Sequence, residues 1–321
     1  MSRPHFPVML KEVLDVLQPR DGGVYVDGTF GNGGYSKAFL QAANCTVWAI
    51  DRDPNVIAKA KYMEAEFNGR LKVVQGRFGD MADLLHGHGV GNVDGVALDL
   101  GVSSMQLDQA ERGFSFKNDG PLDMRMEQTG QTAADVVNLF DEEDLANLIY
   151  EFGEERRSRH VAHAIVEARK EQKFTRTREL AELVRRVVRK SKDGIDSATR
   201  TFQGLRIYIN DELGEVDRGL MGAEKLLGPN GRLAVVSFHS LEDRRVKVFL
   251  NERSGNLPNP SRHLPDSGTR GPDPTFKLLK RGVVKPSKDE CRLNARSRSA
   301  RMRLAERTNA DSWAPSGGGP T

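Results

Sequence analysis

The chain has 321 residues and a formal net charge of +3, with 38% hydrophobic and 29% charged residues. No window approaches about eighteen consecutive apolar residues and no basic-then-apolar leader opens the sequence, so we expect a cytoplasmic protein that makes no membrane contact. Cys45 and Cys291 are the only cysteines, which excludes a disulfide framework and a four-cysteine zinc site. The length allows a large core and more than one domain, and we expect no metal centre.

Positive charge is concentrated in two parts of the chain. Residues 244–321 contain 17 Lys and Arg against 7 Asp and Glu, whereas the rest of the chain contains 31 against 38. Residues 154–192 contain 13 against 6. Such segments favour a polyanionic partner, but composition alone allows a solvated surface equally well.

The first hundred residues alternate between strand and helix signals. We expect a helix over 5–17, strands over 24–27, 45–50, 71–74 and 93–100, and helices over 36–43 and 55–67. This alternation predicts a parallel sheet with helices on its faces.

The next hundred residues differ, because they have helical periodicity and no convincing strand. Helices are predicted over 142–152, 159–170 and 177–190, and the last places leucines and valines on one face with arginines opposite. We interpret residues 105–198 as an inserted helical domain that recognises the substrate.

The α/β pattern resumes after this insertion. A helix is predicted over 200–213, and strands over 232–237 and 276–284, while residues 288–306 are basic with little hydrophobic content. The predicted organisation is a first part of the sheet domain at 1–104, the helical insertion at 105–198, a second part with the basic segment at 199–308, and a disordered tail at 309–321.

A glycine-rich loop follows the first predicted strand. Asp27 ends that strand, four glycines lie in residues 28–34, and a helix begins near Ser36. Nucleotide-binding α/β folds use this layout, and Asp51 stands where they place a carboxylate for ribose hydroxyls. NAD and S-adenosylmethionine both fit. However, Ser36 replaces the third glycine of the dinucleotide pattern, and Asp27 would repel a pyrophosphate while attracting a cationic amino group, which favours S-adenosylmethionine and a methyltransferase.

Two further residues follow predicted strands. Phe78 comes shortly after the third strand, and Asp99 ends the fourth. Ligands of doubly wound sheets bind at the carboxyl ends of the strands, so these residues should lie at one edge with Asp27 and Asp51. Phe78 is suited to stack on an adenine, and Asp99 to contact the methionine end of the cofactor or a substrate nitrogen.

Several motifs together resemble the bacterial small-subunit ribosomal RNA methyltransferase H family nearly end to end. They are His5-Phe-Pro-Val-Met-Leu, Asp27-Gly-Thr-Phe-Gly-Asn-Gly-Gly, Asp51-Arg-Asp-Pro, Leu98-Asp-Leu-Gly-Val-Ser-Ser, Arg112-Gly-Phe-Ser-Phe, Gly120-Pro-Leu-Asp-Met-Arg-Met, Gly153-Glu-Glu-Arg, Thr199-Arg-Thr-Phe-Gln, Phe238-His-Ser-Leu-Glu-Asp-Arg and Arg303-Leu-Ala-Glu-Arg. Many methyltransferases share the glycine loop, whereas the Asp-Met-Arg-Met and Phe-His-Ser-Leu-Glu-Asp segments are distinctive.

The resemblance implies a class I, Rossmann-like S-adenosylmethionine methyltransferase sheet with an inserted all-helical domain. It also implies methylation of the N4 amine of a decoding-centre cytosine in 16S rRNA of the small ribosomal subunit. The cofactor contacts it implies are Asp27, Gly33, Gly34, Tyr35, Asp51, Phe78, Asp99 and Gln106. The family usually has His at Tyr35 and Pro at Met105, so only a backbone contact at Tyr35 would be retained. A homodimer is left open.

The reaction needs an acceptor for a proton of the cytosine amine, whose lone pair is delocalised into the ring. We expect Asp99 or the backbone of residues 101–103, with Ser103, to provide it. Arginines of the insertion and of residues 292–307 are the candidates for binding RNA phosphates. The alternatives are an NAD(P)-dependent oxidoreductase and a non-catalytic RNA-binding factor of ribosome assembly.

Overall fold

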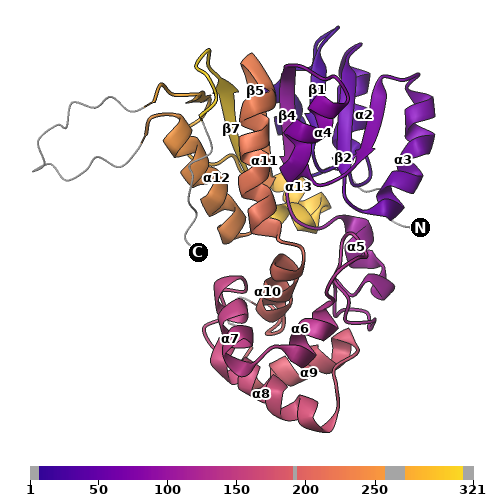
Figure 1. The fold of residues 1–321 in the computed structure, drawn as a ribbon, viewed down its shortest axis with the longest axis vertical. Helices are drawn as coiled ribbons and strands as arrows, with labels where there is room; N and C mark the ends of the chain where they lie inside the picture. The colour runs from indigo at the N-terminus through magenta and orange to yellow at the C-terminus, as the bar shows by residue number, and fades with distance from the viewer. Residues whose placement is uncertain (1–6, 191–193, 257–271, 314–321) are drawn as a thin grey trace, which may run out of the picture. The chain divides into compact units, whose positions relative to one another are not determined.

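The computed structural model describes residues 7–190, 194–256 and 272–313 (Figure 1). The chain forms two compact units. The sheet unit comprises Met1–Gly101 and Leu213–Thr321, and the helical unit comprises Val102–Glu212. Within the described residues, no helix has both the length and the apolar character that crossing a membrane requires.

The sheet unit is built on a seven-stranded sheet of order β3-β2-β1-β4-β5-β7-β6. Its strands are β1 Val24–Asp27, β2 Thr46–Asp51, β3 Leu71–Gln75, β4 Val93–Asp99, β5 Leu227–Ser237, β6 Phe276–Leu278 and β7 Arg301–Arg307. The first five run parallel, whereas β7 is antiparallel to both β5 and β6. This arrangement confirms the predicted α/β class.

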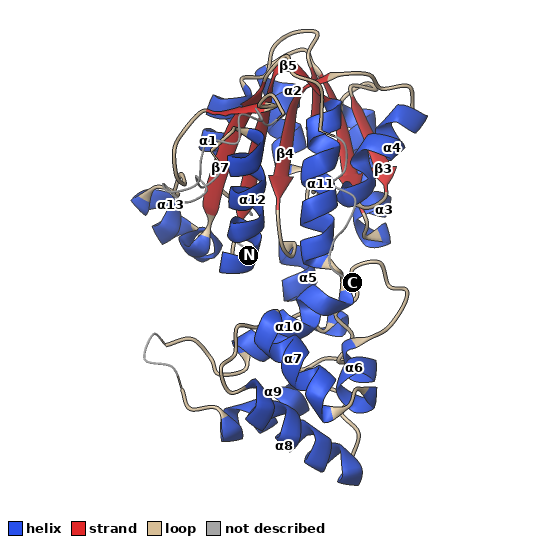
Figure 2. Ribbon diagram, turned by 60° about the vertical axis from the view of Figure 1, so that its left-hand side comes forward, coloured by secondary structure: helices blue, strands red, loops and turns tan. Residues whose placement is uncertain are grey.

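Helices cover both faces of this sheet, as Figure 2 shows. The helices of the sheet unit are α1 Leu10–Leu17, α2 Gly34–Ala42, α3 Pro54–Glu66, α4 Met81–Gly87, α11 Glu212–Leu226, α12 Ser240–Arg253 and the short α13 Lys288–Leu293, with 3-10 turns η1 Phe78–Asp80 and η3 Ala295–Ser299. The central strands are therefore buried on both sides, which explains their nearly continuous apolar sequences. Val26, Ile50, Leu98 and Val235 from four strands share one core with Leu220 of α11.

The C-terminal strand β7 lies inside a segment that the sequence analysis described as basic with little hydrophobic content. Met302, Leu304 and Ala305 are buried, whereas Arg301 and Arg303 keep more exposure, so the strand is partly alternating. The preceding strand is also shorter than the predicted 276–284, since β6 covers only Phe276–Leu278.

Residues 309–313 belong to the folded part of the sheet unit, although the sequence suggested disorder from 309 onward. Trp313 donates from Nε1 to the carbonyl oxygen of Asp273 at 2.9 Å. Its ring centroid lies 4.3 Å from the guanidinium of Arg253. The rest of the expected tail, 314–321, lies outside the described residues.

The helical unit contains α5 Ser104–Asp108, η2 Ala110–Arg112, α6 Ala133–Leu139, α7 Glu142–Glu151, α8 Ser158–Glu171, α9 Thr177–Val187 and α10 Thr199–Ile209. Its core gathers side chains such as Ile149, Ile165 and Leu180. Phe202 and Leu205 of α10 belong to the same core. For this reason the unit extends to Glu212, beyond the boundary expected at 198/199.

Candidate active site

Three carboxyl groups end neighbouring parallel strands of the sheet unit. Asp27 ends β1, Asp51 ends β2 and Asp99 ends β4. In the register of the sheet, Asp27 is opposite Ala49 of β2 and Ala97 of β4. The three groups therefore lie at one edge of the sheet, as the alternation of strands and helices predicted.

Asp27 is turned into the protein and fixes the glycine loop. It is only 1% exposed, and its Oδ2 accepts hydrogen bonds from Ser36 N at 3.1 Å and Ser36 Oγ at 2.7 Å. Its Oδ1 accepts one from Thr29 N at 3.3 Å. Burial raises the pKa of the Asp27 carboxyl to about 6. Ser36 thus contributes a hydroxyl to the loop, which a third glycine would lack.

The glycines at the start of α2 are required by the protein's own packing. Gly33 is the N-cap of α2 with a φ of +72°, a conformation that favours glycine. A Cβ on Gly34 would clash with the ring of Pro7. Tyr35 is 3% exposed and its hydroxyl donates to Val8 O at 2.5 Å. Its phenol is therefore engaged inside the protein, and the backbone is the part of Tyr35 that remains suited to a ligand.

Asp51 braces the same loop while keeping capacity for a ligand. Its Oδ2 accepts a hydrogen bond from Gly31 N at 2.8 Å, and its Oδ1 accepts one from Asp53 N at 2.9 Å. Each carboxylate oxygen can accept a further hydrogen bond, so Asp51 can receive two hydroxyl groups. Burial raises the pKa of Asp51 to about 6.

Asp99 has an unsatisfied oxygen. Its backbone N–H donates to Thr29 Oγ1 at 2.7 Å, but its buried Oδ1 has no hydrogen-bond partner among the described residues. Burial raises the pKa of Asp99 well above its ordinary value, and the nearby carboxylates of Asp27, Glu242 and Glu290 reinforce the shift. A buried orphan acceptor among carboxylates suits a cationic ligand group, so the site fits the amino group or sulfonium of S-adenosylmethionine.

Two glutamates add to the carboxyl groups at this edge, and one of them, Glu242, lies in the segment that the sequence places directly after the fifth strand. Glu242 of α12 is 1% exposed, and its Oε2 accepts from Phe238 N at 2.8 Å while its Oε1 lies 3.0 Å from His239 Nε2. Glu290 of α13 accepts from Met9 N at 2.8 Å, across 281 residues of sequence. The distinctive Phe-His-Ser-Leu-Glu-Asp segment was a signal for Glu242, but no sequence pattern indicated Glu290.

Phe78 lies in η1, directly after β3, and is half-buried against the sheet core. Its Cβ is 3.4 Å from the place that a Cβ on Gly28 would take. Phe78 is thus anchored beside the glycine loop and is only partly buried, which is compatible with the predicted stacking on an adenine.

The other two predicted site residues belong to the helical unit and form a capping box. Ser103 Oγ accepts from Gln106 N at 3.3 Å, and Gln106 Oε1 accepts from Ser103 N at 2.9 Å. Gln106 is 5% exposed. This box fixes the start of α5 although Met105 stands where the family usually has proline.

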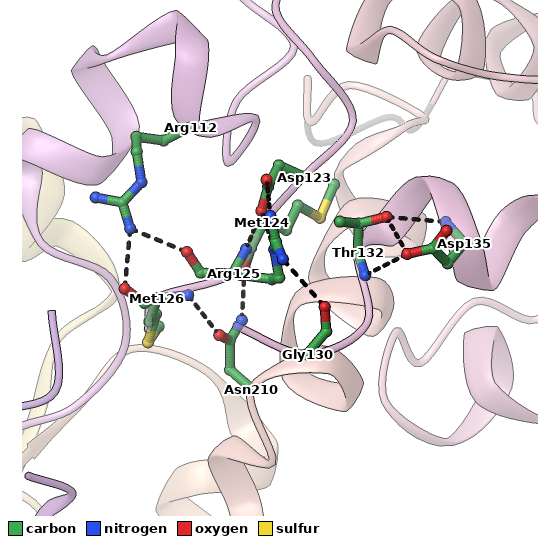
Figure 3. A network of polar contacts seen from close by, with 9 residues as sticks. All are labelled: Arg112, Asp123, Met124, Arg125, Met126, Gly130, Thr132, Asp135 and Asn210. Carbon is green, nitrogen blue, oxygen red and sulfur yellow. Dashed lines mark hydrogen bonds and ion pairs between the residues drawn. The ribbon is translucent and has the colours of Figure 1, made fainter. Parts of the chain in front are cut away.

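The Asp-Met-Arg-Met segment is held by a polar network within the helical unit (Figure 3). Arg112 Nη2 donates to the carbonyl oxygens of Arg125 at 2.9 Å and Met126 at 3.0 Å. Asn210 donates to Met124 O and accepts from Met126 N, both at 2.8 Å. Met124 has a φ of +65°, which is unusual for a residue with a side chain. The observed role of this motif is to fix a backbone turn.

The two basic segments differ in how their charges are used. In the helical unit, several cations are exposed and form no ion pair with any described residue: Arg156, Arg159, Lys173, Arg178, Arg186, Arg189 and Lys190. In β7, Arg303 Nε lies 2.7 Å from Asp243 Oδ1, and Arg307 donates to the carbonyl oxygens of Glu224 and Thr275 at 3.0 Å each. Arg303 and Arg307 therefore hold parts of the fold together, whereas phosphate binding by the arginines of residues 292–307 stays a prediction.

Comparison with known proteins identifies the family. Residues 2–308 match the MraW methylase family. The "Ribosomal RNA small subunit methyltransferase H" of Paramagnetospirillum magneticum is 60% identical over 311 residues, which cover 97% of this chain and 98% of that protein. The protein of the same name from Rhodospirillum rubrum is 60% identical over 319 residues, covering 98% of each. A third, from Parvibaculum lavamentivorans, is 59% identical over 310 residues, 96% of this chain and 91% of that protein. The matched proteins are methyltransferases and they cover nearly the whole chain, which rules out the oxidoreductase alternative. The chain belongs to the MraW methylase family.

Proposed function

We propose that this protein transfers a methyl group from S-adenosylmethionine to the exocyclic N4 amine of a cytosine in 16S rRNA of the small ribosomal subunit. The names of its relatives support a small-subunit ribosomal RNA substrate. The observation that carries the cofactor assignment is the orphaned, buried Oδ1 of Asp99. It is surrounded by further carboxylates, an environment that a cationic cofactor would complement.

Each predicted contact has a distinct part in holding the cofactor. Asp51 accepts the two ribose hydroxyls with its free lone pairs, and Phe78 stacks on the adenine. Asp99 faces the cationic methionine end. Gly33, Gly34 and Tyr35 contribute backbone, and the part of Asp27 is to keep their loop in place through Ser36.

When bound, S-adenosylmethionine supplies an electrophilic methyl group on a sulfonium. The protein's task is then to place the cytosine amine in line with that group and to accept one of its protons. Asp99 or Ser103 is proposed as the acceptor. Asp99 fits this role only when ionised, and a bound cation favours that state because it stabilises the carboxylate.

We assign RNA recognition to the helical unit, with its exposed arginines on the phosphates. The target base must be unstacked or already unpaired to reach the acceptor. Because the substrate is ribosomal, the site of action is the cytoplasm. The Gln106 contact belongs to the same proposal, and its capping box would hold the amide rigid.

Methyl transfer to isolated small subunits tests this function. Subunits from a strain lacking the protein are incubated with enzyme and labelled S-adenosylmethionine, and the modified nucleoside is identified by mass. We expect N4-methylcytidine in 16S rRNA. Binding to subunits without any transfer would favour the non-catalytic assembly factor, and a product methylated at another atom would overturn the N4 assignment.

A further inference from the structure

Helix α11 approaches the turn that carries Phe78 through a glycine. A Cβ on Gly219 would lie 2.6 Å from Phe78 Cε2 and closer still to Cδ2, so the edge of the ring rests directly on the helix backbone. Glycine is among the poorest helix formers, and in the middle of α11 it therefore needs a packing reason. The position of the Phe78 ring provides that reason.

Glu215, one turn before Gly219, fixes the backbone beside Phe78. Its side chain is fully buried, and Oε2 accepts a hydrogen bond from Gly79 N at 3.1 Å. Its Oε1 accepts one from Arg218 Nη2 at 2.7 Å and lies 3.8 Å from Arg77 Nη1. A buried carboxylate is costly unless it is paired, and here its partners include both neighbours of Phe78.

Phe78 is thus restrained from three directions. Gly28 lies beside its Cβ, Gly219 lies against its ring edge, and Glu215 holds the amide of the next residue. We propose that Glu215 and Gly219 are positioning residues, which hold the Phe78 ring in advance in the orientation that stacks on the adenine of S-adenosylmethionine. This inference rests on the proposed function, because it takes Phe78 as the adenine contact.

A pair of alanine substitutions on one helix tests the inference. The new methyl group of Gly219→Ala would overlap the edge of the Phe78 ring. The methyl group of Gly222→Ala would lie 3.0 Å from Met81 Cγ and would not contact Phe78. Both remove a helical glycine, so their effects on helix propensity match. The affinity for S-adenosylhomocysteine is measured by calorimetry, and KM for S-adenosylmethionine and kcat are measured with small subunits.

We expect Gly219→Ala to weaken S-adenosylhomocysteine binding and raise KM for S-adenosylmethionine about tenfold, with kcat at saturating cofactor within about twofold of wild type. Gly222→Ala should stay within about twofold in all three quantities. Equal effects of the two variants would overturn the inference. So would a loss of kcat without a change in KM, because pre-orienting the ring acts on cofactor binding.

Two further measurements keep the test decisive if Gly219→Ala does not fold. Glu215→Gln retains an acceptor for Gly79 N–H and should bind S-adenosylhomocysteine more tightly than Glu215→Ala by about fivefold; equal affinities would overturn the role of Glu215. In a Phe78→Ala background, Glu215→Ala should have no further effect on binding, and an undiminished effect would mean that it does not act through the ring. If the wild-type protein bound no S-adenosylhomocysteine, the proposed function itself would fail, whatever the variants do.

Discussion

The carboxyl edge of the sheet and the surface of the helical unit are both rich in charged groups, but those groups differ in their exposure to solvent. Asp27, Asp99 and Glu242 have carboxyl oxygens withdrawn from solvent. The guanidinium groups of Arg178 and Arg186 stand in solvent, with no ion-pair partner among the described residues. The first region is a small set of dehydrated acids, whereas the second is a broad set of hydrated bases.

The difference teaches what each region can recognise. Dehydration makes the protonation of an acid depend on its surroundings, so the carboxyl edge responds strongly to one cation of defined position. Each hydrated arginine contributes little to binding by itself. Several of them together can bind a polyanion, because each contact releases counterions from it. Strand β7 is an instructive intermediate, since Arg301 and Arg303 share the carboxylate of Asp243 and Arg307 donates to backbone carbonyl oxygens.

The most severe challenge to this contrast is removal of the charge at Asp99. We expect Asp99→Asn to weaken binding of S-adenosylmethionine about 100-fold, because the orphaned oxygen loses its negative charge toward the cation. Asp94→Asn is the matched control on the same strand, where the carboxylate pairs with Arg20 and should not matter to the cofactor. Calorimetry measures both. Wild-type affinity and turnover in Asp99→Asn would remove Asp99 from the site.

A second test uses the pH dependence of stability. The pKa of Asp27 is about 6 in the folded protein and about 3.9 when unfolded, so the folded state binds more protons between these values and loses stability as pH rises through them. Asp27→Asn does not titrate. Its free energy of unfolding relative to wild type should therefore rise by about 2 kcal/mol from pH 4.5 to 7.5, measured by urea unfolding without cofactor. An unchanged difference would mean that Asp27 is not dehydrated.

A third test asks whether the β7 arginines belong with the fold. Arg303 is only 14% exposed and pairs with Asp243, whose pKa it helps to lower. We expect Arg303→Ala to reduce the free energy of unfolding by about 1–2 kcal/mol while leaving the salt dependence of subunit binding unchanged. Thermal unfolding and binding at several salt concentrations provide the two readings. A flatter salt dependence with unchanged stability would place Arg303 on the RNA.

The smallest expected effect is that of a single exposed arginine. Removing Arg186 should lower the slope of log affinity against log salt by about 0.7–0.9 and leave the free energy of unfolding within about 0.5 kcal/mol of wild type. Arg178→Ala should behave in the same way. If neither variant altered the slope, Arg178 and Arg186 would not contact the RNA phosphates.

The sequence was sufficient to predict the carboxyl edge, because strand ends of a parallel sheet meet by construction. It placed Asp27, Asp51 and Asp99 together for that reason. It did not reveal that the Tyr35 hydroxyl is engaged by Val8, since a hydrogen bond between distant segments leaves no local pattern. Glu290 was missed for the same cause. Strand β7 was missed because its arginines, of which Arg307 is itself buried, conceal the partial alternation of its apolar residues.

The contact between Met9 and Glu290 has a consequence for how the protein is made. The glycine loop lies against Pro7 and Val8, and the residue after them is held by a carboxylate from the other end of the fold. A nascent chain that has emerged only as far as β5 already contains every strand-end aspartate, but neither β7 nor Glu290. We therefore expect the proposed cofactor site to be completed late in synthesis, so that competence for methyl transfer is among the last properties the growing chain acquires.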